Sequence, residues 1–263
     1  MEITEETPSI FTYTKPTFPS DCLFNISPSS IGRFFSMPKI WYMDNMTDVG
    51  QTFTGNTGSV TGTICHHIYE CVVKGIPVNR DEINDQLDKY MLLNPNPAVD
   101  VTQVKTDYPL VTAAVVNDYI LASKANKVEA EKQIVGKVCN GIYVGGTVDR
   151  IEYQDDGIVV DYKNVATKPA DNAPIPFDYK IQLLAYAYIL RQLGYEINRI
   201  RIVYGIRPTK TLPARCVVVT ESIDFIADKL INDTLQLIAE SVLAVKENPK
   251  LAYLIFKSMD FKE

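Results

Sequence analysis

Residues 146–163 read GTVDRIEYQDDGIVVDYK, a stretch in which two runs of β-branched residues flank the polar turn Gln154-Asp155-Asp156-Gly157. This pattern predicts two antiparallel strands joined as a hairpin. In such a hairpin Asp149 lies close to the position opposite Asp161, and Lys163 shares the face of Asp161 because side chains alternate along a strand. The stretch therefore predicts that two carboxylates and an amine converge on one point.

This convergence admits two interpretations. Two neighbouring carboxylates repel each other unless a proton or a cation lies between them, and oxygen ligands with open positions suit Mg²⁺ or Mn²⁺. Lys163 would then orient a water molecule or offset the charge of a phosphate. The alternative is a pair of solvated hairpin carboxylates, because a short sequence such as Asp-Tyr-Lys also occurs by chance. The stretch alone leaves both interpretations open.

Length and composition indicate an ordinary globular chain. The 263 residues suffice for one large α/β domain or two small ones, and 46% of them are hydrophobic and 22% charged. A net charge of −6 argues against bulk electrostatic capture of nucleic acid, although it leaves room for a local basic groove. No apolar run reaches the roughly 20 residues that span a bilayer, and the acidic N-terminus lacks the features of a signal peptide. We therefore expect a cytoplasmic protein without a membrane partner.

The cysteines do not suggest a structural framework. Five are scattered along the chain without a Cys-x-x-Cys pair: Cys22, Cys65, Cys71, Cys139 and Cys216. A disulfide scaffold and a structural zinc site are both disfavoured by this pattern, and reduced thiols are expected.

Periodicity and turn signals divide the chain into an extended arm over residues 1–26 and a single domain over 27–263. Within the domain we expect a helical part over 27–126, an α/β core over 127–247 and a C-terminal tail over 248–263. Predicted helices, besides a short one after Ser30, cover 61–74, 79–93, 107–124, 178–193 and 222–246, and predicted strands cover 128–138, 142–153, 158–163, 199–206 and 215–220. The fold class is therefore mixed α/β, with the helix at 178–193 as a crossover on the sheet.

Three further residues are candidates for the same site. Gln182 and Tyr186 are four residues apart on a predicted helix and thus share a face, where Gln182 can hydrogen-bond the lysine. A solvated glutamine and a half-buried tyrosine are the simpler interpretation. His66 and His67 are the only histidines, and adjacent positions on a helix point about 100° apart, so one of them is expected to face the core side. Aromatic residues between Phe34 and Tyr42 are expected to pack in the core.

In order along the chain, these segments resemble the RecB-like branch of the PD-(D/E)XK nuclease superfamily. The matching motifs are Ser27-Pro28-Ser29 with Met37-Pro38 and Trp41-Tyr42, Gly62-Thr63-Ile64-Cys65-His66, Gly146 to Glu152, Val159 to Asn164, and Gln182 to Tyr186. Each motif is weak alone, but five in the right order and spacing are specific together. The resemblance covers about Ser27 to Ile206 and implies a restriction-endonuclease-like core, a central mixed sheet flanked by helices.

The resemblance also implies roles for residues that match the motifs. Asp149, Asp161, His66 and the backbone carbonyl of Tyr162 would bind Mg²⁺ or Mn²⁺. Lys163, Gln182 and Tyr186 would complete the catalytic set together with the two aspartates. Residues near these motifs that we expect to contact DNA are Arg150, Lys168, Lys180 and Arg207.

The resemblance therefore predicts a metal-dependent deoxyribonuclease, and by family tendency an exonuclease. Met37 stands where some relatives have an iron–sulfur cysteine, so no such cluster is expected, and no ATP is expected because the chain lacks a GxxxxGK[ST] motif. Any unwinding would come from a partner helicase or recombination protein. Two alternatives stay open: a catalytically silent nucleic-acid-binding or assembly protein on a nuclease fold, and an enzyme that acts on RNA.

Overall fold

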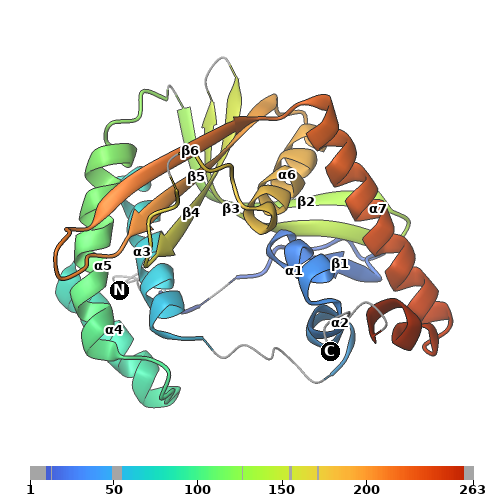
Figure 1. Cartoon of the computed structure of the whole chain (residues 1–263), viewed down its shortest axis with the longest axis horizontal. Coiled ribbons are helices and arrows are strands. Elements are labelled where there is room, and N and C mark those ends of the chain that lie inside the picture. Colours follow the sequence, from blue (N-terminus) through green and yellow to red (C-terminus); the bar gives the residue numbers. More distant parts are fainter. Residues whose placement is uncertain are drawn as a thin grey trace, which may run out of the picture.

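The computed structural model describes residues 10–12, 14–48, 55–125, 127–153, 156–170 and 172–257. Its centre is a six-stranded mixed sheet with helices on both faces (Figure 1). The strands are β1 Phe24–Ile26, β2 Lys127–Cys139, β3 Ile142–Tyr153, β4 Gly157–Val165, β5 Ile197–Ile206 and β6 Arg215–Ser222. The helices are α1 Ile31–Ser36, α2 Pro38–Met46, α3 Thr57–Lys74, α4 Arg80–Leu93, α5 Val101–Val115, α6 Phe177–Gln192 and α7 Phe225–Glu247, with the single turns η1 Pro28–Ser30, η2 Val116–Ile120 and η3 Tyr253–Lys257. The predicted α/β class is confirmed.

Strand β3 lies inside the sheet, with one neighbouring strand along one edge and two along the other. β2 pairs with it antiparallel from Ile142 to Tyr153. The other edge is shared: β1 pairs in parallel with residues 142–144, and β4 pairs antiparallel with residues 150–152. In the described part of the chain no strand pairs with residues 145–149 on that edge. The sheet is therefore notched beside Asp149.

The predicted hairpin is present as β3 and β4, with Ile151 opposite Val159. Gln154 and Asp155 of its expected turn lie outside the described residues. β4 and β5 are parallel and α6 connects them, which matches the expected crossover. β6 then pairs antiparallel with β5.

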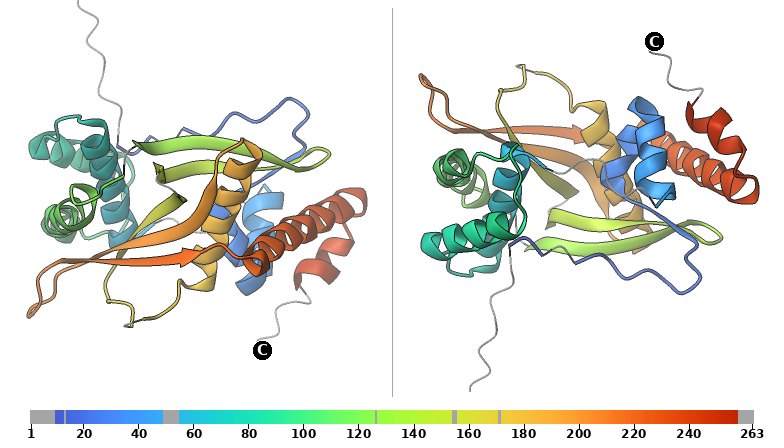
Figure 2. Two further views of the ribbon diagram at one scale, coloured as in Figure 1. Left: turned by 90° about the horizontal axis from the view of Figure 1, so that it is seen from above. Right: turned by 90° about the horizontal axis from the view of Figure 1, so that it is seen from below.

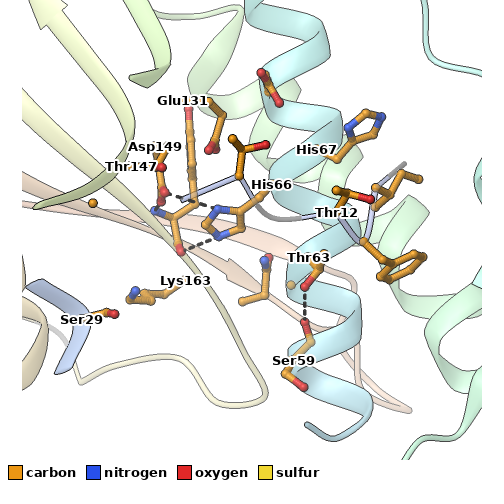
Figure 3. Close-up of a pocket in the computed structure, with 18 of the residues that line it drawn as sticks. Thr12, Ser29, Ser59, Thr63, His66, His67, Glu131, Thr147, Asp149 and Lys163 are labelled. Carbon is orange, nitrogen blue, oxygen red and sulfur yellow. Dashed lines mark hydrogen bonds and ion pairs between the residues drawn. The ribbon is translucent and has the colours of Figure 1, made fainter. Parts of the chain in front are cut away.

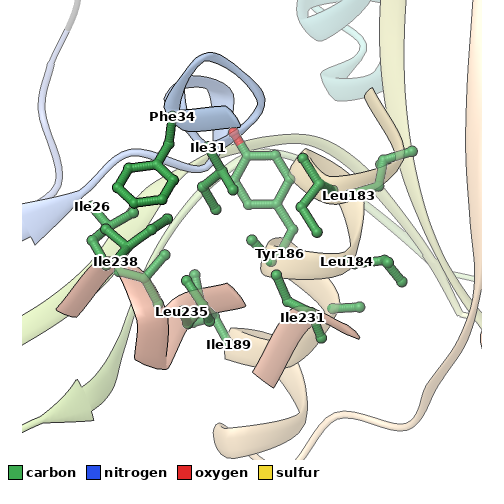
Figure 4. Close-up of a cluster of buried hydrophobic side chains, with 14 of the residues drawn as sticks. Ile26, Ile31, Phe34, Leu183, Leu184, Tyr186, Ile189, Ile231, Leu235 and Ile238 are labelled. Carbon is green, nitrogen blue, oxygen red and sulfur yellow. The ribbon is translucent and has the colours of Figure 1, made fainter. Parts of the chain in front are cut away.

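The larger hydrophobic core lies between one face of the sheet and the helices α1, α2, α6 and α7. Figure 4 shows its centre, where Phe34 of α1, Ile189 of α6 and Leu235 of α7 point toward one another. Helix α6 is apolar on most of its circumference because it is enclosed by the sheet and by α7. Phe34 and Trp41 are buried, which confirms the expected core role for these two aromatic residues, whereas Phe35 is 43% exposed.

A second core lies on the opposite face of the sheet, where α3, α4 and α5 pack. Ile64 of α3 and Val111 of α5 meet Val160 of β4 and Val203 of β5 there. The helices between residues 27 and 126 thus do not form one body, because α1 and α2 belong to the first face and α3–α5 to the second. Figure 2 shows the two groups of helices on opposite sides of the sheet.

Several helix boundaries differ from the predicted ones, and capping explains them. Helix α3 begins at Thr57, four residues early, because Asn56 and Ser59 form a reciprocal capping box. Helix α5 begins at Val101 rather than at 107, because the Asp100 carboxylate accepts a hydrogen bond from Gln103 N at 3.0 Å. Among the described helices, none has the length and apolarity needed to cross a membrane.

Candidate active site

The notch in the sheet exposes the backbone of β4 to Asp149. The last paired residues of the hairpin are Arg150 and Val160. Beyond them Asp149 Oδ2 accepts a hydrogen bond from Tyr162 N at 2.8 Å. A side chain thus replaces the strand pairing that ends there, and this fixes the Asp149 carboxylate against β4.

A second group of polar side chains lies beside Asp149 and consists of Asp161, Lys163 and Gln182. Lys163 Nζ lies 2.8 Å from Asp161 Oδ2 and 3.0 Å from Asp161 Oδ1. Gln182, on α6, donates to Asp161 Oδ1 at 2.9 Å and accepts from Lys163 Nζ at 3.3 Å. Asp161 is only 2% exposed; the glutamine and the lysine satisfy its Oδ1, whereas its buried Oδ2 has no hydrogen-bond partner among the described residues and contacts only the Lys163 charge. The amide also fixes the position of the ammonium group.

Helix α3 contributes His66. Its Nε2 donates to the Tyr162 carbonyl at 3.0 Å, and its Nδ1 lies 3.5 Å from Asp149 Oδ1. His67 points elsewhere and lies 3.6 Å from Cys71 Sγ, so one histidine of the pair faces the site. His66 therefore connects Asp149 of β3 with the backbone of β4.

Glu131 of β2 is a site residue that the sequence interpretation missed. Its neighbours Ala130 and Lys132 pair with Arg150 and Val148, which places Glu131 opposite Asp149. Ligand atoms of His66, Glu131 and Asp149 lie within 4.8 Å of one another. The backbone of Glu131 has φ 50°, a left-handed conformation that costs a non-glycine residue energy and that clusters at functional sites. Figure 3 shows Glu131, Asp149 and His66 pointing toward one another.

The charges in the site perturb one another. Burial and the Asp149 charge raise the pKa of Glu131 to about 8. Burial raises the pKa of Asp161 to about 6, although Lys163 opposes the shift. Burial alone would lower the pKa of His66, but Asp149, Asp161 and Glu131 raise it to about 9. Burial would likewise raise the pKa of Asp149, yet His66 and Lys163 hold it below its usual value.

These residues fit a divalent cation. Buried carboxylates this close together keep a proton unless a cation neutralises them, and burial, followed by the Asp149 charge, raises the pKa of Glu131 in this way. Two carboxylates and an imidazole form a donor set that suits Mg²⁺ or Mn²⁺. Asp161 is not in this group of three, and its carboxylate is bonded to Lys163 and Gln182 instead.

The site lies in a cavity of about 1050 Å³ between α3 and the β2–β3 hairpin. Its walls are mainly small or hydroxyl-bearing, with Ser59 and Thr63 of α3, Thr147 of β3 and Ser29 of η1 (Figure 3). Tyr186 of α6 also lines the cavity, and its ring covers Gly146, where a Cβ atom would lie 3.2 Å from Tyr186 Cε1. Glycine at this position therefore allows the tyrosine to approach the strand.

The expected DNA-contacting residues occupy different positions. Arg150 is 2% exposed, and its Nε donates to Glu152 Oε1 at 2.8 Å. This corrects the expectation that Arg150 contacts DNA, because a buried and paired guanidinium cannot reach a phosphate. Lys180 is paired with Glu221 at 2.6 Å, and Lys168 is exposed on the segment after β4. Arg207 lies at the start of α3, since a Cβ at Gly58 would be 4.0 Å from Arg207 Nη2.

Comparison with known proteins agrees with this geometry. The family model of the PD-(D/E)XK nuclease superfamily matches residues 25–249. A solved structure from Eubacterium rectale, named "Putative exonuclease", superposes with a TM-score of 0.58 at 15% identity and covers 85% of this chain and 81% of its own. The structure of SSO0001 gives a TM-score of only 0.30 at 16% identity, over 68% of this chain and 87% of that one. No curated protein matches. With a match over most of its length, the chain belongs to the PD-(D/E)XK nuclease superfamily.

Proposed function

We propose that this protein is a Mg²⁺- or Mn²⁺-dependent deoxyribonuclease of the RecB-like type that hydrolyses phosphodiester bonds from strand ends. One observation carries the proposal: His66, Glu131 and Asp149 converge within 4.8 Å in a cavity that Lys163, paired with Asp161, also lines. Members of the superfamily generally use divalent metals, and this donor set fits one.

Each residue has a defined part in the proposed chemistry. His66, Glu131, Asp149 and the Tyr162 carbonyl would hold the cation, which when bound would polarise a phosphate and make water more acidic. Asp161 would join them as a ligand when Lys163 turns toward the substrate, a role taken from the match of Asp161 to the superfamily's motif. Asp161 also keeps Lys163 charged, since it and Asp149 raise the pKa of the ammonium against the opposing effect of burial.

Lys163 is the positioning group for the reacting phosphate in this proposal. Its ammonium lies beside Asp161 and 5.0 Å from the centre of the Tyr179 ring, and Gln182 holds it from the side of α6. A fixed positive charge near the phosphate stabilises the negative charge that develops during hydrolysis. Tyr186, on the face of α6 that carries Gln182, would support the backbone of the bound strand.

The substrate path is proposed from the rim of the cavity. Arg207 lies near the first turn of α3, where the positive end of the helix dipole adds to its charge and favours anions. Lys168, and Lys180 when released from Glu221, would add charge on the same side as Lys163. A helicase or recombination protein would present the strand, and a cytoplasmic location fits such a partner.

Cleavage assays on labelled DNA test the proposal. Wild-type protein should degrade DNA with Mg²⁺ or Mn²⁺ and stop in EDTA. Asp149→Asn and Lys163→Ala should each lose about 10²-fold or more in rate, as removal of one group that stabilises developing charge typically does. Lys229→Ala, an exposed lysine on α7, is the matched control and should keep full activity.

Two further measurements separate the alternatives. Matched DNA and RNA strands distinguish the substrates, since only the 2′-hydroxyl differs along the backbone. Calorimetric titration with Mn²⁺ distinguishes an active site from a silent one. Absence of both Mn²⁺ binding and cleavage, with nucleic acid still bound, would replace the proposed nuclease by a binding or assembly protein.

A further inference from the structure

Tyr162 belongs to the active site by its backbone and to the second core by its side chain. Its N–H donates to Asp149 Oδ2 at 2.8 Å. Its carbonyl accepts a hydrogen bond from His66 Nε2 at 3.0 Å (Figure 3). Because side chains alternate along β4, the Tyr162 ring points to the face of the sheet opposite to Lys163, where it is only 2% exposed. A shift of this ring would therefore move two backbone groups of the site.

Three aromatic rings contact the Tyr162 ring. The ring centres of Tyr69 and His66, both on α3, lie 4.6 Å and 5.9 Å from it. Tyr119 is the ring contact from another element, edge to face at 6.3 Å and 76°. Among the described residues the Tyr162 hydroxyl has no hydrogen-bond partner. The position of the ring therefore depends on how its neighbours pack against it.

Tyr119 is itself fixed by charged groups. It belongs to η2, a π-helical turn that follows α5, and such turns are rare and frequently lie at functional sites. Its hydroxyl donates to Glu152 Oε1 at 2.8 Å. The guanidinium carbons of Arg150 and Arg201 lie 5.3 Å and 5.6 Å from the centre of its ring. One carboxylate and two cations thus hold the ring that packs against Tyr162.

Glu152 is the centre of these contacts. Its carboxylate is 1% exposed and also accepts hydrogen bonds from Arg150 Nε at 2.8 Å and from Arg201 Nη1 at 2.7 Å. Apolar side chains in place of a buried ion network are often as stable or more stable, so a gain in stability is a weak reason for such a network. A fully bonded network does fix its members in one arrangement. Here it fixes Tyr119 directly behind the residue that carries the backbone groups of the site.

We propose that Tyr119 and Glu152 are positioning residues for the cation site and act through Tyr162. Glu152 fixes Tyr119, Tyr119 fixes the Tyr162 ring, and the ring determines where the Tyr162 N–H and carbonyl lie. A displaced Tyr162 would release the Asp149 carboxylate and withdraw its own carbonyl from the cation. The inference rests on the proposed nuclease function and goes beyond it, because it assigns to the site two residues on the far face of the sheet.

The test measures Mn²⁺ affinity by calorimetric titration, and kcat and KM for DNA cleavage. Tyr119→Leu removes the ring and should weaken Mn²⁺ binding about tenfold, the lower end of what loss of an outer-shell partner costs a metal site. It should lower kcat by about the same factor with little change in KM. Tyr119→Phe keeps the ring and its contacts with the two arginines, and should recover most of both losses.

A matched control separates positioning from loss of stability. Tyr108 is a 2% exposed tyrosine of α5 in the same core, and its hydroxyl donates to Asn84 Oδ1 at 3.1 Å. Tyr108→Leu should lower the free energy of unfolding in urea as much as Tyr119→Leu does, yet keep the Mn²⁺ affinity and kcat of the wild type. An equal loss of Mn²⁺ affinity in both variants would overturn the inference.

Glu152→Gln decides the question if Tyr119→Leu does not fold. It keeps the shape of the side chain and an acceptor for Tyr119, but removes the charge that holds the two guanidinium groups together beside the ring. It should weaken Mn²⁺ binding in the same direction. Wild-type Mn²⁺ affinity in the folded variant overturns the inference but not the nuclease. Wild-type protein that neither binds Mn²⁺ nor cleaves DNA overturns the proposed function and the inference with it.

Discussion

Substitution of Glu131 by glutamine tests the cation site without a catalytic assay. Glu131 and Asp149 ligand atoms lie within 4.8 Å, where two like charges repel by about 3–4 kcal/mol at an effective dielectric constant of 20. The opposite charge of His66 in the same cluster offsets part of this repulsion. We therefore expect Glu131→Gln to stabilise the metal-free protein by about 2 kcal/mol once the carboxylate is ionised.

The pH dependence of this gain has a defined sign. The folded-state pKa of Glu131 is raised to about 8, so between the ordinary carboxyl value and pH 8 the folded protein holds a proton that the unfolded chain releases. Wild-type stability relative to the glutamine variant therefore falls as pH rises through this window. The two proteins should be nearly equal near pH 4.5 and differ fully at pH 8.5.

Urea unfolding in EDTA at the two pH values measures the effect, followed by the same titration with Mn²⁺. Mn²⁺ should stabilise wild-type protein more than the variant, because loss of a ligand should weaken binding by at least the roughly 10–100-fold that loss of an outer-shell partner costs. Glu129→Gln is the matched control on the same strand. Its pKa is lowered by hydrogen bonds from Lys132 and Tyr153 despite opposing desolvation, so this change should cost up to about 1 kcal/mol at pH 8.5. A Glu131→Gln protein that gains no stability at pH 8.5, or responds to Mn²⁺ like the wild type, would refute the reasoning.

Three other changes have clear expected outcomes. Glu152→Ala should lower the free energy of unfolding in urea by about 3–5 kcal/mol, because it removes the partner of the buried Arg150 guanidinium. The control Glu240→Ala, at an exposed position, should change the free energy of unfolding by no more than about 0.5 kcal/mol. Gln182→Leu should lower kcat about tenfold or more on DNA with little change in KM, and an unchanged kcat would remove Gln182 from the site. Gly146→Val should cost about 1–3 kcal/mol by overpacking against Tyr186, and an unchanged urea midpoint would show that the tyrosine moves freely.

The parts of the site that lie close together in sequence were predicted well. Asp161 and Lys163 share a face because they are two residues apart on one strand, and the structure places their charged groups 2.8 Å apart. The prediction that Gln182 lies in the site required only that α6 begin near the end of β4. A helix that crosses from β4 to the parallel β5 must pass over that end. Local periodicity and short connections were sufficient here.

Glu131 was missed because of a change in register. Starting from the Asn140-Gly141 turn, Cys139 pairs with Ile142, and regular pairing from there would place Lys132 opposite Asp149. The structure has a bulge between Lys137 and Cys139 that shifts the pairing by one residue and brings Glu131 there instead. Nothing in the sequence marks that bulge, so this carboxylate could not be assigned from it.

Arg150 was assigned wrongly for a reason that strand geometry explains. Side chains alternate along β3, so the residue after Asp149 points to the opposite face of the sheet. Glu152 lies on the same face of β3 as Arg150. Its Oε2 is 2.7 Å from Arg201 Nη1, and its Oε1 accepts a hydrogen bond from Tyr119 OH at 2.8 Å. Closeness in sequence to a catalytic residue was mistaken for closeness in space.

The notch in the sheet unites these observations. If β4 paired with β3 along its whole length, Tyr162 N would bond to a strand carbonyl and Asp149 would have no backbone group to hold. Because β1 takes the first part of that edge and β4 only the last, Asp149 is left at the point where pairing ends. His66 and Glu131 can then reach it from α3 and β2. The position of the site thus depends on where β3 changes its neighbour, a property of the sheet that no single motif specifies.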